Sequence, residues 1–358
     1  MLRSVNSDES KRACWAFRSL NPFCTQDSEM RVLTNPAEEM WWGVAEACPW
    51  ATFFHTPAWH KLAESVYSGV EDASVGFVTQ NGGKAVLPLL KRRRKRLPLV
   101  YDLVSTFAGC YGGVIADFPV STETERRCYS EVVSPRVLSM RVTGNPFWRG
   151  GRIAFGGEAR DDFTYVVDLS PGFDAIWKNF RQGHRRATKQ GRQSGVYVRL
   201  ARSMEDFEAY YCAYEDSLKR WGDKASSCYP WKLFLILYEM YNRYKENIRL
   251  WLACRKNEIL AGALVFYMNN HVVYWHGAAY EKYFDFMPNN VLHADILRHA
   301  CDSPKKYSYY DFNPSGGHEG VARFKSYFGG TRKDLTNVTA RPSFAGRVFK
   351  LLRKLPIR

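Results

Sequence analysis

Helical and extended patterns alternate twice in the same order along this sequence, which predicts a mixed α/β chain in two halves. In the first half, helix-like segments alternate with short apolar strands, and Asn81-Gly82-Gly83 has the composition of a hairpin turn. The second half begins near Leu169 and repeats that order. A length of 358 residues suits about two domains. The shared order indicates an internal duplication, although no residue-level repeat accompanies it.

The periodicity predicts two long helices, over residues 122–138 and 173–194, and two short strands, over residues 152–155 and 307–312. Residues 1–30 are polar and aperiodic, which is typical of a loose leader. No apolar run approaches the ~20 residues that a membrane span requires, and the leader lacks the apolar centre of a secretory signal. We therefore expect a protein that is not exported.

The cysteines also indicate a protein that stays inside the cell. The chain has nine of them, an odd number, scattered from Cys14 to Cys301 without a Cys-x-x-Cys pair. This spacing argues against a disulfide framework and against a zinc site. It fits a reducing cytoplasm, where most of these thiols are buried apolar groups.

A formal net charge of +15 is concentrated in three basic segments. Residues 91–96 are six consecutive cations, residues 178–202 contain eight Lys or Arg and no acid, and residues 341–358 contain six and no acid. Such an excess favours a polyanionic partner or an anionic membrane surface. Each segment is equally well explained as an ordinary solvated face or loop.

The last basic segment also has an amphipathic helical pattern. Five apolar residues fall on one face of the expected helix: Phe344, Val348, Leu351, Leu352 and Leu355. This face suits either docking on the second domain or peripheral contact with a membrane near a lipid-linked acceptor.

The segment from Tyr309 to Gly330 contains the strongest candidate site. A buried strand is followed by the turn Pro314–Gly317, and then by Val321 and Phe328 at helical spacing. Lys325 is therefore expected on a short helix beside the strand end. A cation held there can stabilise the negative charge that develops on a reacting carbonyl, whereas the simpler interpretation is an exposed helix lysine.

This segment resembles the C-terminal signature of Fem-type aminoacyltransferases: Asp-Phe, a glycine-containing turn, then Gly-Val-x-x-Phe-Lys-x-x-Phe-Gly. Related proteins are the FemAB-like and BioF2-like members of the GNAT acyltransferase superfamily. Tyr111-Gly112-Gly113 and the basic segment 185–196 also fit the family, in the order that the family has them.

The resemblance implies an α/β fold of two GNAT-like domains in tandem, with mixed sheets flanked by helices. The expected divisions are a leader over 1–30, a first domain over 31–168, a second domain over 169–340 that carries the signature, and a basic amphipathic tail over 341–358.

The resemblance assigns the family's lysine to Lys325, as an oxyanion or acceptor-phosphate contact. Asp311, at the end of the preceding strand, either orients Lys325 or accepts the proton of the amine, or is only a turn cap. His318 and His276 are alternative proton acceptors. A histidine in an aromatic strand, as His276 is, is more often a hydrogen-bonded core residue. No metal site is expected.

Further side chains are candidates for binding the substrate. Phe324 is expected to pack beside the catalytic lysine. Ser217 and Arg220 lie one helical turn apart, and the resemblance implies a hydroxyl-x-x-Arg pairing that binds the acceptor; the alternative for Arg220 is a solvent salt bridge. The remaining candidates are cavity walls (Trp221 and Tyr229) and phosphate contacts on the basic helix (Arg185, Arg186 and Lys189). At Tyr111, the two glycines that follow either let a backbone pass close to a ligand or another strand, or form a tight structural turn.

Three functions remain open. The first is an N-acyltransferase that moves an aminoacyl group from aminoacyl-tRNA to an amine of a peptide, cell-wall precursor or small metabolite. The second is an acyl-CoA-dependent acetyltransferase of polysaccharide or lipid modification, which lacks support because no Arg/Gln-x-x-Gly-x-Gly/Ala turn for pyrophosphate is present. The third is a non-enzymatic nucleic-acid or membrane-binding protein. In the first two cases the donor is a co-substrate and no cofactor is bound permanently.

Overall fold

The computed structural model describes residues 30–94, 97–148, 157–225 and 227–341. The described residues of the first half form eight strands and three helices: β1 (Met30–Thr34), α1 (Glu38–Ala47), α2 (Pro57–Val66), β2 (Val70–Asp72), β3 (Val75–Thr79), β4 (Lys84–Leu87), β5 (Leu90–Arg94), β6 (Leu97–Val104), β7 (Ile115–Ala116), α3 (Thr122–Glu131) and β8 (Val137–Val142). A short 3-10 helix, η1 (Phe53–His55), precedes α2.

The second half contains the remaining strands and helices: β9 (Glu158–Asp168), α4 (Phe173–Asn179), α5 (Gln182–Gln193), β10 (Tyr197–Leu200), α6 (Met204–Trp221), α7 (Trp231–Arg243), β11 (Ile248–Arg255), β12 (Glu258–Met268), β13 (His271–Ala279), α8 (Pro288–Asp302), β14 (Tyr309–Asp311), α9 (Glu319–Ser326) and β15 (Thr331–Ala340). Two 3-10 helices, η2 (Gly222–Lys224) and η3 (Glu281–Phe286), follow α6 and β13. The mixed α/β class predicted from the sequence is confirmed.

The two halves repeat one order of elements. In each, a first strand and two helices lead into antiparallel strands, and a helix then connects two parallel strands. The parallel pairs are β6 with β8, connected through α3, and β13 with β14, connected through α8. The repeated order agrees with the predicted tandem arrangement.

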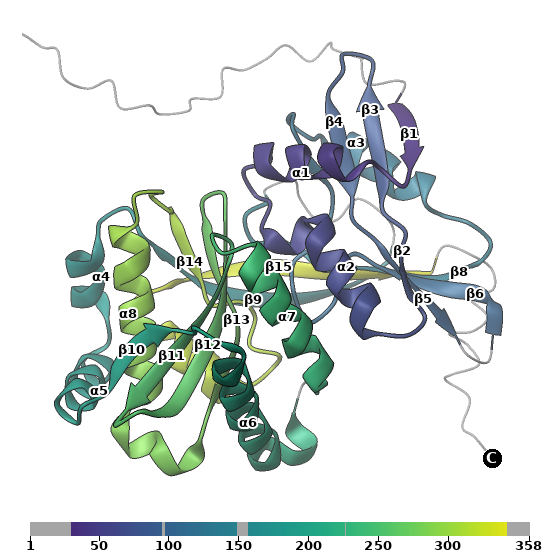
Figure 1. Cartoon of the computed structure of the whole chain (residues 1–358). Helices are drawn as coiled ribbons and strands as arrows, with labels where there is room; N and C mark the ends of the chain where they lie inside the picture. The colour runs from purple at the N-terminus through teal and green to yellow at the C-terminus, as the bar shows by residue number, and fades with distance from the viewer. Residues whose placement is uncertain (1–29, 95–96, 149–156, 226, 342–358) are drawn as a thin grey trace, which may run out of the picture.

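One sheet joins the halves. Its eleven strands run in the order β10-β11-β12-β13-β14-β9-β15-β8-β6-β5-β2, while β1, β3, β4 and β7 form a separate four-stranded sheet. Strand β15, drawn in yellow, crosses from the second half to the first (Figure 1). It pairs with β9 and, from Val338 to Ala340, with β8 of the first half.

Helices cover both faces of the second half. Helices α4, α5 and α8 pack on one face, where Phe180 and Val291 are part of the core. Helices α6 and α7 pack on the other face, in a core that also includes side chains of α1 and α2. The ring of Trp59 on α2 lies 5.2 Å from that of Phe266 on β12 and 5.4 Å from that of Trp275 on β13. The halves therefore share an aromatic core, which fixes their relative position.

Two of the predicted long helices are shorter than expected. Helix α3 ends at Glu131, and residues 137–142 form β8, because Pro135 cannot continue a helix. The helix predicted over 173–194 is divided into α4 and α5 at Phe180, whose side chain is buried in the core. The predicted strand over 152–155, the leader and the tail beyond Arg341 lie outside the described residues.

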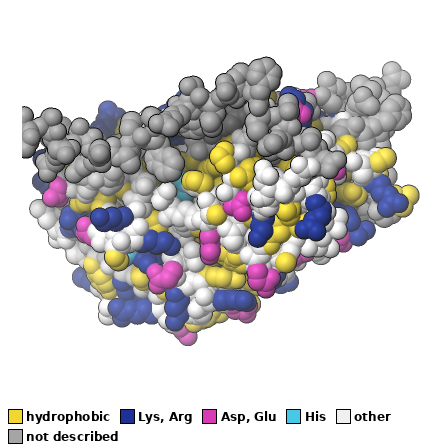
Figure 2. Space-filling view, turned by 90° about the horizontal axis from the view of Figure 1, so that it is seen from above, with side chains coloured by type: hydrophobic (Ala, Val, Ile, Leu, Met, Phe, Trp, Pro, Cys, Tyr) yellow, Lys and Arg dark blue, Asp and Glu magenta, His cyan; other side chains and the backbone are white. Residues whose placement is uncertain are grey.

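Part of the first basic segment, residues 91–96, forms a strand, and some of its cations are paired with acids. Its first four residues belong to β5, where Arg93 donates two hydrogen bonds to Glu71 and Arg94 pairs with Asp102 at 2.6 Å. On the face seen in Figure 2, Lys and Arg side chains are interspersed with acidic and apolar ones. Cross-strand pairing thus offsets some of the concentrated charge that the sequence indicates.

Candidate functional site

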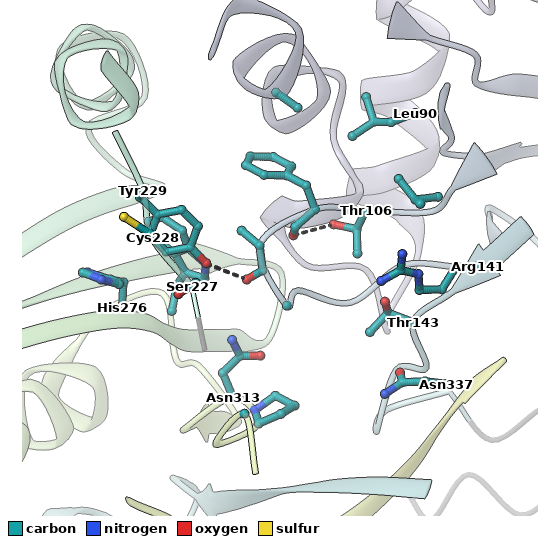
Figure 3. A pocket seen from close by; sticks show the side chains of 18 of the residues that line it. Leu90, Thr106, Arg141, Thr143, Ser227, Cys228, Tyr229, His276, Asn313 and Asn337 are labelled. Atoms are coloured by element: carbon teal, nitrogen blue, oxygen red, sulfur yellow. Dashed lines mark hydrogen bonds between the residues drawn. The ribbon is translucent and has the colours of Figure 1, made fainter. Parts of the chain in front are cut away.

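A cavity of about 1590 Å³ lies between the two halves. One wall is formed by the second half, through α6, the middle of β13, the turn at residues 313–318 and α9. The opposite wall is the face of the large sheet made by β5, β6, β8, β9 and β15. Figure 3 shows these walls facing each other, with His276 and Tyr229 on one side and Arg141 and Asn337 on the other.

The separation of two strands creates the end of the cavity at which Lys325 lies. Strands β13 and β14 pair in parallel only as far as Val273 and Asp311. Beyond Asp311 the chain turns away through Asn313, which has a left-handed backbone with φ of 57°, and Pro314. Helix α9 then returns Lys325 to the gap between the strands, as its spacing in the sequence predicts.

Lys325 is a buried cation at the cavity wall, with only 5% of its surface exposed. Its Nζ donates to the carbonyl oxygen of Asn313 at 2.8 Å and to that of Pro314 at 3.2 Å. Burial lowers the pKa of the ammonium group to about 7, against the opposing attraction of Asp311 and Asp162. The exposed surface lysine considered above is therefore the wrong interpretation.

Asp311 lies behind the lysine, completely enclosed. One carboxylate oxygen accepts from Thr164 Oγ1 at 2.6 Å and from the backbone N–H of Asn313 at 2.8 Å. The other accepts from the hydroxyl of Tyr111, 2.7 Å away and 200 residues earlier in the chain. Burial raises the pKa of Asp311, opposed by these hydrogen bonds. The geometry suits a group that positions the turn and Lys325 better than one that collects a proton from substrate.

Tyr111 therefore contacts Asp311 from the first half, and its role in this structure is to connect the two halves at the site. Gly112 explains why the backbone passes so closely here: a Cβ on it would lie 2.1 Å from Ser105 Oγ. Of the expected alternatives, the structure shows Gly112 close to the end of a neighbouring strand.

Three predicted substrate contacts line the cavity: Ser217, Tyr229 and His318. Ser217 Oγ donates to the carbonyl oxygens of Ala213 and Ala279, at 3.0 and 3.1 Å. The Tyr229 hydroxyl donates to Ala108 O at 3.4 Å. Both hydroxyls are thus already engaged in positioning the wall.

His318 and Trp221 form a ring pair at the cavity wall. Their ring centroids are 4.7 Å apart, which joins the end of α6 to the start of α9. The other candidate histidine, His276, forms a hydrogen bond of 2.5 Å with the Tyr210 hydroxyl through Nδ1, and burial lowers its pKa to about 3. The prediction of a hydrogen-bonded histidine at this position is confirmed.

Arg220 and Phe324 are directed elsewhere. The guanidinium of Arg220 lies 4.8 Å from the ring of Phe284 and 3.5 Å from Ala279 O. Phe324 packs among His184 and Phe328 in the core behind α9. Phe324 is next to Lys325 in helix α9, but its ring packs in the core and does not line the cavity.

The basic helix α5 is packed against α8, and none of the described residues that line the cavity comes from it. Arg185 donates to the carbonyl oxygens of Lys178 and Phe180, at 2.6 and 2.7 Å, and so closes the end of α4. Arg186 and Lys189 are exposed. The start of α5 nevertheless adjoins α9, because the guanidinium of Arg181 lies 4.3 Å from the ring centroid of Tyr327.

The sheet wall of the cavity was not predicted from the sequence. Arg141 and Thr143 face the cavity from β8 and the residue after it, while Met140 and Val142 alternate with them in the core. Further polar side chains on this wall come from β5, β6, β9, β15 and the residue after β15: Arg92, Asp102, Arg160, Asp162, Asn337, Thr339 and Arg341. The alternation of apolar and polar residues from 137 to 143 is the signal that predicts such a strand.

A titration of stability tests the environment of Lys325. Between pH 7 and 10.5 the unfolded chain binds this proton and the folded chain does not, so rising pH stabilises the wild type. Relative to Lys325→Met, the wild-type free energy of unfolding should therefore increase across this interval, on the order of 4 kcal/mol in total. Denaturant unfolding of both proteins at several pH values measures the difference. A difference independent of pH would mean that the lysine has an ordinary pKa.

Other kinds of site are not found within the described ranges. No group of three or more His, Cys, Asp or Glu side chains there could hold a metal ion. The seven cysteines in these ranges are free thiols. In the same part of the chain, no helix combines the length and apolar character needed to cross a bilayer.

Comparison with known proteins identifies the domain that carries Lys325. Residues 178–326 match the model of the acetyltransferase (GNAT) domain family. No curated protein matches the chain. Among solved structures, the chain is similar to FemX, with a TM-score of 0.63 at 11% identity, over 90% of this chain and 100% of that one.

Two further structures share the fold. The C-terminal domain of a protein assigned as a lysylphosphatidylglycerol synthetase, from Agrobacterium fabrum, has a TM-score of 0.54 at 10% identity, over 88% of this chain and 94% of that one. A conserved protein of unknown function from Bacteroides thetaiotaomicron VPI-5482 has a TM-score of 0.52 at 11% identity, over 85% and 96%. This chain is an acyltransferase with a GNAT domain at residues 178–326, set in a fold like that of FemX.

Proposed function

We propose that this acyltransferase forms an amide bond, by transferring an aminoacyl group from aminoacyl-tRNA to an amine of a peptide, cell-wall precursor or small metabolite. The observation that carries the proposal is Lys325, a buried cation at the wall of a cavity large enough for two substrates. Lys325 supplies the charge stabilisation that acyl transfer needs, and no covalent nucleophile is required.

The two carbonyl contacts of Lys325 support this role in the reaction. An ammonium group has three N–H donors, and two of them are held by Asn313 O and Pro314 O. The third is free to bind the carbonyl oxygen of the donor. The neutral amine attacks the carbonyl carbon, a C–N bond forms, and the oxygen becomes an oxyanion that Lys325 stabilises. Collapse breaks the ester C–O bond, and the leaving ribose oxygen takes up the proton that the amine loses.

The start of α8 argues against acyl-CoA as donor. A pyrophosphate bound at a helix N-terminus needs free backbone N–H groups. Helix α8 begins with Pro288, which has none, and the N–H groups of Asn290 and Val291 are donated to Met287 O. Helix α5 also covers this turn, since a Cβ on Gly191 would lie 2.8 Å from Phe286 O.

The charges around the cavity support a polyanionic donor. Arg92, Arg141 and Arg160 are exposed on the sheet wall, and only Asp102 and Asp162 oppose them among the described acids that line it. Together with the exposed Arg186 and Lys189 on α5, they suit the phosphates of an RNA acceptor stem, which are bound chiefly by Lys and Arg. The acceptor remains defined only as an amine.

A parallel assay of two donors tests the proposal. Purified protein is incubated with bulk tRNA charged with radiolabelled amino acids, or with radiolabelled acetyl-CoA, each with primary amines extracted from cells. We expect label from tRNA to enter a product that survives mild base, because amides survive conditions that cleave the ester. Base-stable label from acetyl-CoA, and none from tRNA, would replace the proposal with the acetyltransferase that the family model names.

A further inference from the structure

The carboxamide of Asn313 is an unexplained polar group at the end of the cavity at which Lys325 lies. The residue is only 5% exposed, and its Oδ1 is buried without a hydrogen-bond partner among the described residues. It lies on the cavity wall, across the cavity from Arg141 and Asn337 (Figure 3). An unpaired buried acceptor costs roughly 1–3 kcal/mol, so a ligand that satisfies it is the simplest reason for its presence.

The backbone of Asn313 is held from both sides. Its N–H donates to Asp311 and its carbonyl oxygen accepts from Lys325 Nζ, each at 2.8 Å. A φ of 57° is a conformation that asparagine tolerates better than most residues. These contacts fix the backbone of Asn313 beside the ammonium group of Lys325.

We infer that Asn313 Oδ1 accepts a hydrogen bond from the amine that attacks the acyl carbonyl. The inference rests on the proposed amide-forming reaction, but it concerns the acceptor and holds for either donor. An amine that donates one N–H to Asn313 keeps its lone pair free for the carbonyl carbon, next to the oxygen that Lys325 binds. As the C–N bond forms, the nitrogen becomes positive and the hydrogen bond strengthens. Asn313 takes no proton; the proton leaves with the ester oxygen or thioester sulfur.

Two substitutions at this position separate hydrogen bonding from folding. Asn313→Gly removes the carboxamide and tolerates the positive φ, whereas Asn313→Asp keeps an acceptor oxygen. With the donor saturating, Asn313→Gly should raise KM for the acceptor roughly 10-fold or more and leave KM for the donor within about 2-fold. Asn313→Asp should recover most of the loss. Asn257→Gly, at another left-handed asparagine that is exposed and does not line the cavity, is the matched control and should behave as wild type.

The assay uses whichever donor supports turnover of the wild type, so failure of tRNA as donor leaves the inference testable. An unchanged acceptor KM in Asn313→Gly, or an Asn313→Asp variant as impaired as Asn313→Gly, would overturn it. If neither donor supports turnover, the Asn313 side-chain amide is observed by NMR, assigned by its loss in Asn313→Gly. A saturable shift with butylamine but not with butanol supports amine binding, and no shift with butylamine rejects it.

Discussion

Replacing Lys325 by methionine is expected to lower acyl transfer ~10²-fold or more, while the protein still folds. The expectation follows from the position of its Nζ, which is fixed by Asn313 O and Pro314 O at the cavity wall and has one further N–H. Such a donor acts mainly in the transition state, so the loss should appear in kcat as well as in kcat/KM. Steady-state kinetics, with the donor that supports turnover in the two-donor assay, measures kcat and kcat/KM.

Arg323→Met is the matched control, because Arg323 is an exposed cation on the same helix. It should keep near-wild-type turnover. The pH profile gives a second check: the cationic form of Lys325 is the active one, so wild-type kcat/KM should fall as pH rises through about 7. The residual activity of Lys325→Met should lack this fall. Wild-type turnover in Lys325→Met would show that the lysine has no part in the chemistry.

Replacing Asp311 by alanine is expected to destabilise the protein by about 3 kcal/mol or more. The change leaves Tyr111, Thr164 and the N–H of Asn313 without their acceptor, in a completely buried site. Tyr111→Phe removes only one donor, so about 1–2 kcal/mol is expected for it. Denaturant unfolding measures each free energy.

The double variant decides whether the two residues act together. Because Tyr111 and Asp311 are in direct contact, the double variant should be less destabilised than the sum of the single ones. Strictly additive losses, or an Asp311→Ala protein as stable as the wild type, would contradict the assigned contact between the halves.

The sequence predicted the parts of the site that depend on local pattern. The strand before Asp311, the turn and the helix that carries Lys325 all follow from residue spacing within 309–330. The partner of Asp311 could not be predicted, because Tyr111 lies 200 residues earlier and only the shared sheet brings it near. The role of Arg185 was missed for a related reason: the break between α4 and α5 creates the carbonyls that it binds.

The sheet wall of the cavity also could not be predicted from the sequence. Strand β15 was not predicted, and its pairing with β8 and β9 is what places Asn337 and Arg341 beside Arg141. A strand that inserts between two others is selected by tertiary context more than by its own composition. The left-handed conformation of Asn313 could not be predicted either. It depends on the bonds that its N–H and carbonyl oxygen form with Asp311 and Lys325.

The position of β15 at the end of the described chain affects folding during translation. Strand β8 pairs with β6 on one side and with β15 on the other, so its second edge stays open until residue 340 has left the ribosome. An unpaired edge offers backbone donors and acceptors to any neighbouring strand. The first half is therefore synthesised well before its sheet is complete, and until then the open edge of β8 can pair with other strands.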